Sequence, residues 1–215
     1  MKRRTLDVIF SIGGLLLAAL VLVLGLVLQN QANFAKNYVT DQLTAQRITF
    51  TAVDKLTEEE KNEPGAQCLQ TYAGQQLTTG NQAECYANKY IALHLGETND
   101  GKTYSETSNE SRAAAAAAKK ANADGAANAA ELDAAAKALD GKVQTLFRGE
   151  TLRGLLLTSY GFSIFGERAQ QAAWVAYGAA LVLFLASIAG FIHALTTPKD
   201  KVVLTETSSG TTDKG

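Results

Sequence analysis

The chain has 215 residues, of which 47% are hydrophobic and 19% are charged, and its formal net charge is −1. This length is enough for one ordinary domain. Nucleic acid is excluded as an expected partner, because a near-neutral chain has no basic face that could neutralise a row of phosphates.

The first long apolar run is Val8–Leu28, in which Ser11 is the only residue with a hydrogen-bonding side chain. A helix rises about 1.5 Å per residue, so this run matches the ~30 Å hydrocarbon core of a bilayer. It is longer than the apolar part of a secretory signal peptide, and no A-x-A cleavage site follows Leu28. The run therefore predicts an uncleaved transmembrane helix.

Several short elements are expected next. Gln29–Arg47 lacks Gly and Pro, so we expect the first helix to continue beyond the apolar run. Residues 48–53 alternate in polarity, which favours a short extended segment or a loop. Thr57–Glu60 matches a capping box and predicts a short helix, which Pro64–Gly65 would end.

A second helix outside the apolar runs is predicted over Gly80–Gly96. Asn81 is the expected cap, with Glu84 three residues later, and Gly96 is the expected end. One face of this helix would carry Ala83, Tyr86, Ala87, Tyr90, Ile91 and His94. On such a face we interpret His94 as a packed or surface residue rather than a ligand.

An alanine-rich insert occupies approximately residues 112–140. The preceding segment Glu97–Ser111 is polar and predicts turns, whereas Arg112–Asp140 predicts helix with weak points at Gly125 and Gly141. We interpret this insert as a solvated helical spacer, and close packing against a neighbouring helix is the alternative.

Large apolar residues return before the second long run. Leu155–Phe165 is too short to span a bilayer; it either completes the core of the middle segment or lies at the membrane interface. Glu167 and Arg168 are expected to keep this patch separate from the second apolar run, Ala172–Leu195.

The second apolar run predicts a second transmembrane helix, and residues 196–215 predict a disordered tail. Small residues recur at four-residue spacing in both runs, which is typical of close helix pairing within one chain or between copies. These residues are Gly14 and Ala18, then Ala172, Ala176 and Ala180, and finally Ala186, Gly190 and Ala194.

Basic residues predict the orientation in the membrane. Lys2, Arg3 and Arg4 precede the first run, and Lys199 and Lys201 follow the second. The positive-inside rule then places residues 1–7 and 196–215 in the cytoplasm and residues 29–171 outside. The expected fold is all-α: two transmembrane helices, 8–28 and 172–195, flank a mainly helical extracytoplasmic domain in the plasma membrane of a bacterium.

The two cysteines, Cys68 and Cys85, both lie in the segment predicted to be outside. In an oxidising compartment they are expected to form a disulfide, which would stabilise the fold by ~3 kcal/mol in the chain-entropy model. The alternative is two unpaired cysteines that act as small apolar residues.

No pattern predicts catalysis, a metal or a cofactor. The two histidines, His94 and His193, fall on opposite sides of the predicted membrane, so they cannot share a metal site. No G-x-S-x-G, H-E-x-x-H or Walker motif occurs. Neither apolar run contains an interior charge of the kind that transporters use.

The chain resembles a group of uncharacterised two-span membrane proteins of actinobacteria. The resemblance is carried by Met1–Leu28, by LTEEE at Leu56–Glu60, by Tyr72–Leu95 and by LRGLLLTSYGFS at Leu152–Ser163. It implies the same topology and an external middle segment, and it transfers no functional residue. Some members carry a label of aromatic ring-opening dioxygenase. We do not extend that label to this chain, because such iron chemistry needs clustered histidine and carboxylate ligands.

The first functional hypothesis is a non-enzymatic, membrane-anchored module that binds another protein of the membrane or envelope, with self-association as a further option. The alternative is a two-span sensor that acts through a separate cytoplasmic protein recruited by the tail. A third hypothesis, an external enzyme that uses carboxylates or the tyrosines near Tyr86 and Tyr90, predicts a concave pocket with converging polar groups.

Overall fold

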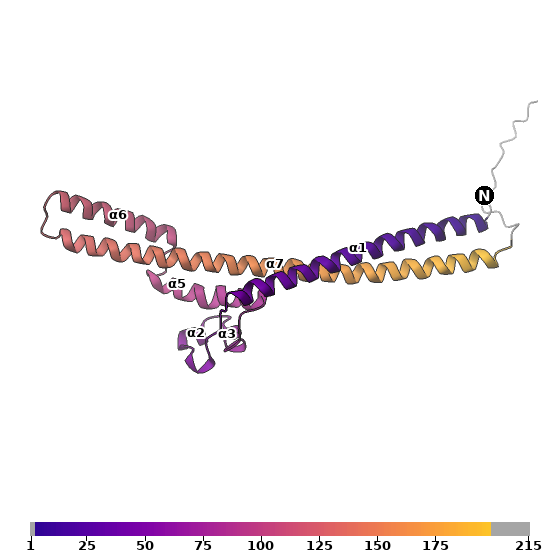
Figure 1. Ribbon diagram of the computed structural model, residues 1–215, viewed down its shortest axis with the longest axis horizontal. Helices are drawn as coiled ribbons and strands as arrows, with labels where there is room; N and C mark the ends of the chain where they lie inside the picture. The colour runs from indigo at the N-terminus through magenta and orange to yellow at the C-terminus, as the bar shows by residue number, and fades with distance from the viewer. Residues whose placement is uncertain (1–2, 199–215) are drawn as a thin grey trace, which may run out of the picture. The chain divides into compact units, whose positions relative to one another are not determined.

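The computed structural model describes residues 3–198, and within this range the chain is helical with one isolated β-bridge, between Thr49 and Gln76. The predicted all-α class is therefore confirmed. The elements in chain order are α1 (Arg3–Ala45), η1 (Val53–Lys55), α2 (Glu58–Asn62), α3 (Gln67–Thr71), α4 (Gly80–Cys85), η2 (Tyr86–Ile91), α5 (Ala92–Thr98), α6 (Tyr104–Ala123) and α7 (Ala129–Thr196) (Figure 1). The predicted disordered tail lies outside the described residues from Lys199 onwards.

The chain divides into two compact units. Among the described residues, unit 1 comprises 3–33 and 166–198, and unit 2 comprises 34–165. Helices α1 and α7 contribute to both units, and each is long and apolar enough to cross a membrane. The expected continuation of the first helix beyond Leu28 is confirmed, since α1 ends at Ala45.

In unit 1 the two apolar helices lie side by side and run in opposite directions (Figure 1). Near one end the His193 Nδ1 lies 3.0 Å from the Asp7 Oδ2. Near the other end the side chains of Gln29 and Gln170 are hydrogen-bonded at 2.6 Å. The pair is therefore antiparallel.

Small residues form the seam between these helices. A side chain at Gly14 would overlap the Ser187 hydroxyl, and one at Gly190 would overlap the Ser11 hydroxyl. Buried residues on α7 in unit 1 are separated by three, four or seven residues, which is the spacing of a coiled-coil seam. They include Ala173, Ala176, Ala180, Ser187 and Ala194. The predicted pairing of the spans is thus present, with a changed set of residues, because Ala172 and Ala186 are exposed.

The core of unit 2 joins the end of α1 to the short helices and to one side of α7. Its buried residues come from segments far apart in the chain, among them Val39, Leu43, Phe50, Leu69, Leu77, Ala87, Leu146 and Leu156. A disulfide links Cys68 in α3 to Cys85 at the end of α4, as predicted. This bond fits an oxidising environment.

Capping residues set the starts of the short helices. The Thr57 box is confirmed, since the Thr57 Oγ1 accepts from the Glu60 N–H at 3.1 Å and the Glu60 carboxylate accepts from the Thr57 N–H at 2.7 Å. The cap predicted at Asn81 is wrong, because Thr79 caps α4 in a box with Gln82. The helical run also passes Gly96 and ends at Thr98, and its middle, η2, is π-helical.

The alanine-rich region forms a helical hairpin made of α6 and the start of α7. The expectation of turns up to Ser111 is wrong, because Thr103 caps α6 and the helix begins at Tyr104. Gly125 breaks the helix with φ +64°, whereas Gly141 lies inside α7. Within residues 112–140 most side chains are exposed, as a solvated helix requires, but α6 lies beside α7 (Figure 1) and buries Ala118 and Ala121, which matches the alternative of packing against a neighbouring helix at these two positions.

Helix α7 also continues without interruption through Glu167 and Arg168, so these charges do not end it. Of the segment Leu155–Phe165, Leu156 is in the core of unit 2, while Leu155 and Phe165 are exposed. The segment is therefore divided between a buried side and an outer side of one helix.

Candidate functional site

The outer side of α7 in unit 2 carries a row of large apolar side chains. We define the α7 apolar face as Phe147, Thr151, Leu155, Thr158, Phe162 and Phe165, which follow one another at steps of three or four residues. Residues at this spacing share one side of a helix. Leu155 and Phe165 are 63% and 75% exposed, and Phe147 and Phe162 are 54% and 38% exposed.

The two threonines of this face do not make it polar. The Thr151 hydroxyl donates to the Phe147 carbonyl at 2.7 Å, and the Thr158 hydroxyl donates to the Gly154 carbonyl at 2.9 Å. Both hydroxyl groups are therefore satisfied by the helix itself, as is common for threonine within helices. The face offers a partner almost only hydrocarbon and aromatic surface.

Two rings from α1 extend the face. Phe34 and Tyr38 are exposed and stack on each other, with ring centroids 5.8 Å apart. The Tyr38 ring packs edge-on to Phe162 at 5.7 Å, and the Phe34 ring does so at 6.5 Å. Edge-to-face packing at this range is favourable for aromatic rings, so the three rings hold one another in place.

Contacts on the opposite side of α7 explain why this face is exposed on the surface of unit 2. Leu146 and Leu156 are in the core of unit 2. Arg153 donates to the Asn88 Oδ1 at 3.2 Å and to Glu150 at 3.2 Å. Because these contacts determine the rotation of the helix, the apolar face is a defined surface of unit 2.

A stack of aromatic rings runs along η2 and α5. Ring centroids are 4.7 Å apart between Tyr86 and Tyr90, and 4.5 Å apart between Tyr90 and His94. Phe50 packs edge-on to Tyr86 at 5.3 Å. Burial raises the pKa of Tyr86 to about 12, with smaller contributions from Tyr90 and Glu60, so this phenol stays protonated at neutral pH.

His94, the histidine singled out in the sequence, is exposed at the end of this stack. Its Nδ1 lies 2.7 Å from the Tyr90 carbonyl, which can only accept, so this nitrogen carries the proton. Its Nε2 is 3.7 Å from the buried Glu60 carboxylate. Glu60 already caps α2, so both side chains have a structural use.

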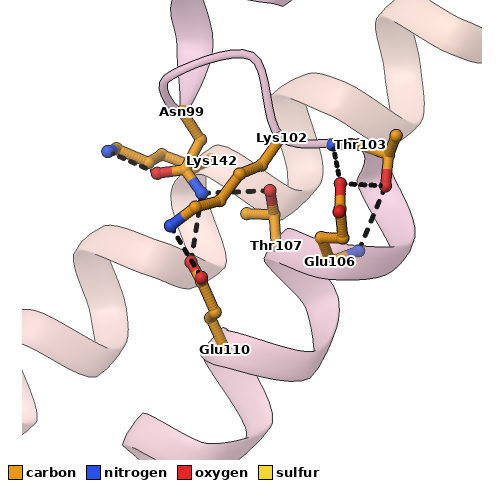
Figure 2. Close-up of polar contacts among 7 residues, drawn as sticks. All are labelled: Asn99, Lys102, Thr103, Glu106, Thr107, Glu110 and Lys142. Atoms are coloured by element: carbon orange, nitrogen blue, oxygen red, sulfur yellow. Dashed lines mark hydrogen bonds and ion pairs between the residues drawn. The ribbon is translucent and has the colours of Figure 1, made fainter.

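A polar junction ties α5, α6 and α7 together (Figure 2). The buried Asn99 donates to the Thr107 hydroxyl at 3.1 Å and to Glu110 at 3.3 Å, and it accepts from the Lys142 Nζ at 2.8 Å. Lys102 and Glu110 form an ion pair at 2.7 Å. The hydrogen bond from Lys102 holds the pKa of Glu110 below its usual value. This junction was missed in the sequence, because its residues lie up to 43 positions apart.

The only site residues predicted from the sequence are the two cysteines, Cys68 and Cys85. The structure brings Cys68 and Cys85 together, and among residues 3–198 it places no three His, Cys, Asp or Glu side chains as a metal-binding group. A cavity in unit 1 lies beside the seam between α1 and α7. It has a volume of about 240 Å³ and is lined by Ser11, Gly14, Ser187 and Gly190 among others, whose small side chains leave the cavity open.

The sequence had singled out the large residues of Lys142–Phe165 without deciding which of them are exposed. The three-and-four spacing of the α7 apolar face was the available signal, but the same spacing describes a buried face equally well. Comparisons of this chain with protein-family models, with curated proteins and with solved structures found no match.

Proposed function

We propose that this chain is a non-enzymatic, membrane-anchored interaction module of the cell envelope. Unit 2 lies outside the plasma membrane of a bacterium, both termini are cytoplasmic, and the α7 apolar face binds another protein. The single observation that carries this proposal is the exposure of that face, in the part of the chain between the apolar runs 8–28 and 172–195.

The exposed rings favour a binding role. Burial of a large apolar side chain contributes about 1.5–3 kcal/mol, and exposed apolar patches on stable proteins commonly mark interaction sites. Phe165, Leu155 and Phe162 offer such a gain, because more than a third of each side chain is exposed. Their helix is already held by the core, so a partner need not order it on binding.

Two features support the proposed placement of unit 2 outside the membrane: the distribution of basic residues and the disulfide. The basic residues near both ends of the chain support cytoplasmic termini by the positive-inside rule. The bond between Cys68 and Cys85 supports an oxidising compartment for unit 2.

The polar side chains of unit 2 support a role in binding rather than in catalysis. Burial raises the pKa of Tyr86 to about 12, still further above neutral pH than that of an ordinary tyrosine, so its phenol is not a poised base. His94 is hydrogen-bonded to a backbone carbonyl, and Glu60 is used as a helix cap.

The test is in-cell crosslinking of the full chain, gentle detergent extraction and identification of the proteins that co-purify. Leu155→Glu places a charge on the face, so we expect it to abolish recovery of the partner. Val53→Glu is the matched control, since Val53 is 53% exposed in the same unit but lies off the face. A chain recovered alone, or a partner retained equally by both variants, would contradict the proposal.

A further inference from the structure

We infer that Trp174 anchors unit 1 at the outer boundary of the bilayer, with its indole ring among the lipid headgroups and ester carbonyls. This inference rests on the membrane location in the proposed function, and it adds a partner, the lipid interface, and a depth. It follows from two polar pairs between α1 and α7, from the exposure of Trp174 and from the chemistry of indole.

Two polar pairs bracket the apolar part of unit 1. The Asp7 carboxylate and the His193 ring meet at one end. At the other end Gln29 and Gln170 exchange two hydrogen bonds, in which each side-chain amide donates to the oxygen of the other at 2.6 Å. At ~1.5 Å per residue these pairs lie about 33–35 Å apart along either helix, slightly more than the ~30 Å hydrocarbon core of a bilayer. The two pairs therefore fit the two interfaces of one membrane.

The side chains of α7 in unit 1 become steadily less polar from its glutamine end inwards. Glu167 and Arg168 are charged and exposed. Gln170 carries an uncharged amide, and Trp174 follows one helical turn later. Between Trp174 and His193 no charged residue occurs. The order of charged, amide, aromatic and apolar side chains matches the fall in polarity from water through the headgroups into hydrocarbon.

Trp174 presents its ring to the outside of the helix pair. The residue is 66% exposed, whereas the neighbouring Ala173 is buried in the seam. An indole combines a large apolar ring with one N–H donor and has no acceptor. The hydrocarbon core offers that donor no partner, while ester and phosphate oxygens at the interface accept from it. The interface is therefore the depth at which both parts of this side chain are satisfied.

Tyr177 supports Trp174 from the side of α1. The two rings pack edge to face, with centroids 5.9 Å apart and planes at 79°. The Tyr177 ring also lies directly against α1, because a Cβ at Gly25 would come 2.7 Å from its Cε1 atom. The glycine makes room for a ring that contacts both α1 and Trp174, so the anchor acts on the helix pair rather than on α7 alone.

The test uses the fluorescence of Trp174, which is the only tryptophan of the chain. The full-length protein is reconstituted in phosphatidylcholine vesicles whose acyl chains carry bromine near the headgroup, at mid-chain or near the terminal methyl group. Bromine quenches tryptophan at short range, so the most effective lipid reports the depth of the ring below the nearer membrane surface. The direction in which the protein inserts into the vesicle therefore does not affect the result.

The matched control is the double variant Trp174→Phe with Val182→Trp, which moves the only tryptophan along α7. Val182 is 66% exposed, as Trp174 is, and it lies about 12 Å further along the helix. This position is near the middle of the predicted span 172–195.

We expect quenching of the parent chain to be strongest with bromine near the headgroup and to decrease as the bromine moves towards the terminal methyl group. The order should reverse in the control variant, because its ring lies in the hydrocarbon core. The parent measurement needs no substitution, so it does not depend on whether a variant folds.

Strongest quenching of Trp174 by mid-chain or terminal bromine would overturn the inference and leave the membrane anchor of the proposed function intact. Quenching of the control variant but not of the parent would also overturn it, since Trp174 would then lie in water. Quenching of neither protein by any of the lipids would place unit 1 outside the bilayer, which would contradict both this inference and the membrane location in the proposed function.

Discussion

At the scale of single residues, the polar side chains of unit 2 hold helices together. Asn99 is 4% exposed and exchanges hydrogen bonds with residues of both α6 and α7. Glu110 receives both the Lys102 ammonium and the Asn99 amide. These contacts orient the α6–α7 hairpin against α5, because a buried polar group must keep its partners.

Replacing the buried amide tests this role. We expect Asn99→Ala to lower the free energy of unfolding of unit 2 by about 1–3 kcal/mol, since Thr107 and Lys142 lose a partner in a buried site. Denaturant titration of the full chain in detergent measures the change. Asn128→Ala, at an exposed position in the turn between α6 and α7, should have little effect. Equal losses for the two variants would contradict the role of Asn99.

The junction also predicts a dependence on pH. The folded-state pKa of Glu110 is lowered, chiefly by the hydrogen bond from Lys102. Its contribution to stability is therefore present above the unfolded-state pKa of glutamate and is lost as the pH falls through the lowered folded-state pKa. The hydrogen-exchange protection factors of the first turns of α6, which correct for the slower chemical exchange at low pH, should fall under acid, and less so in Glu110→Gln. Glu97→Gln, at an exposed position in α5, should behave as the parent chain.

At the scale of elements, the same residue type has opposite effects at different positions. Gly125, with φ +64°, ends a helix, whereas Gly141 lies within one. Gly14 faces Ser187 across the seam of unit 1, while a side chain at the neighbouring Gly13 would meet no atom within 4 Å. Position relative to a packed neighbour decides these roles.

The two neighbouring glycines provide a matched test of the seam. Gly14→Val should force the helices of unit 1 apart, because its side chain would overlap Ser187, whereas Gly13→Val should not. Gln29→Cys with Gln170→Cys reports the pairing as an internal disulfide, since the parent glutamines are hydrogen-bonded. We expect that disulfide to form in the Gly13 variant and to be strongly reduced in the Gly14 variant; equal yields would mean that the seam tolerates the change.

At the scale of the whole molecule, a disulfide-linked unit of 132 residues, from Phe34 to Phe165, lies in the sequence between the apolar runs 8–28 and 172–195. An oxidised cysteine pair and the distribution of basic residues both favour placing this unit outside the cell. The function that we propose depends on that placement.

Labelling of intact cells tests the placement. We expect Thr145→Cys to react with a membrane-impermeant maleimide added to intact cells, because Thr145 is an exposed residue of unit 2. A cysteine at Thr197, which follows the end of α7, should react only after the membrane is permeabilised. The reverse pattern would place unit 2 in the cytoplasm and would refute the proposed topology.

Much of the fold could be predicted because it depends on local features. Hydropathy over about 20 residues identifies the two helices that are apolar enough to cross a membrane, and the Thr57 capping box lies within four consecutive residues. The boxes at Thr79 and Thr103 carry the same signal, Thr/Ser-x-x-Glu/Gln, and were available but not recognised. No such local pattern indicates that the helix continues past Gly96 or that η2 is π-helical.

The sequence by itself determined the helical class, the two apolar helices and the pairing of the only two cysteines, because composition and short-range spacing suffice for these. Only the tertiary structure decided that Leu156 is buried while Leu155 and Phe162 face outwards. It also decided that α6 packs on α7 and that Ala173 rather than Ala172 enters the seam. The physical reason is that the rotation of a helix is set by partners far away in the chain, and one row of apolar residues fits a core or an open surface equally well.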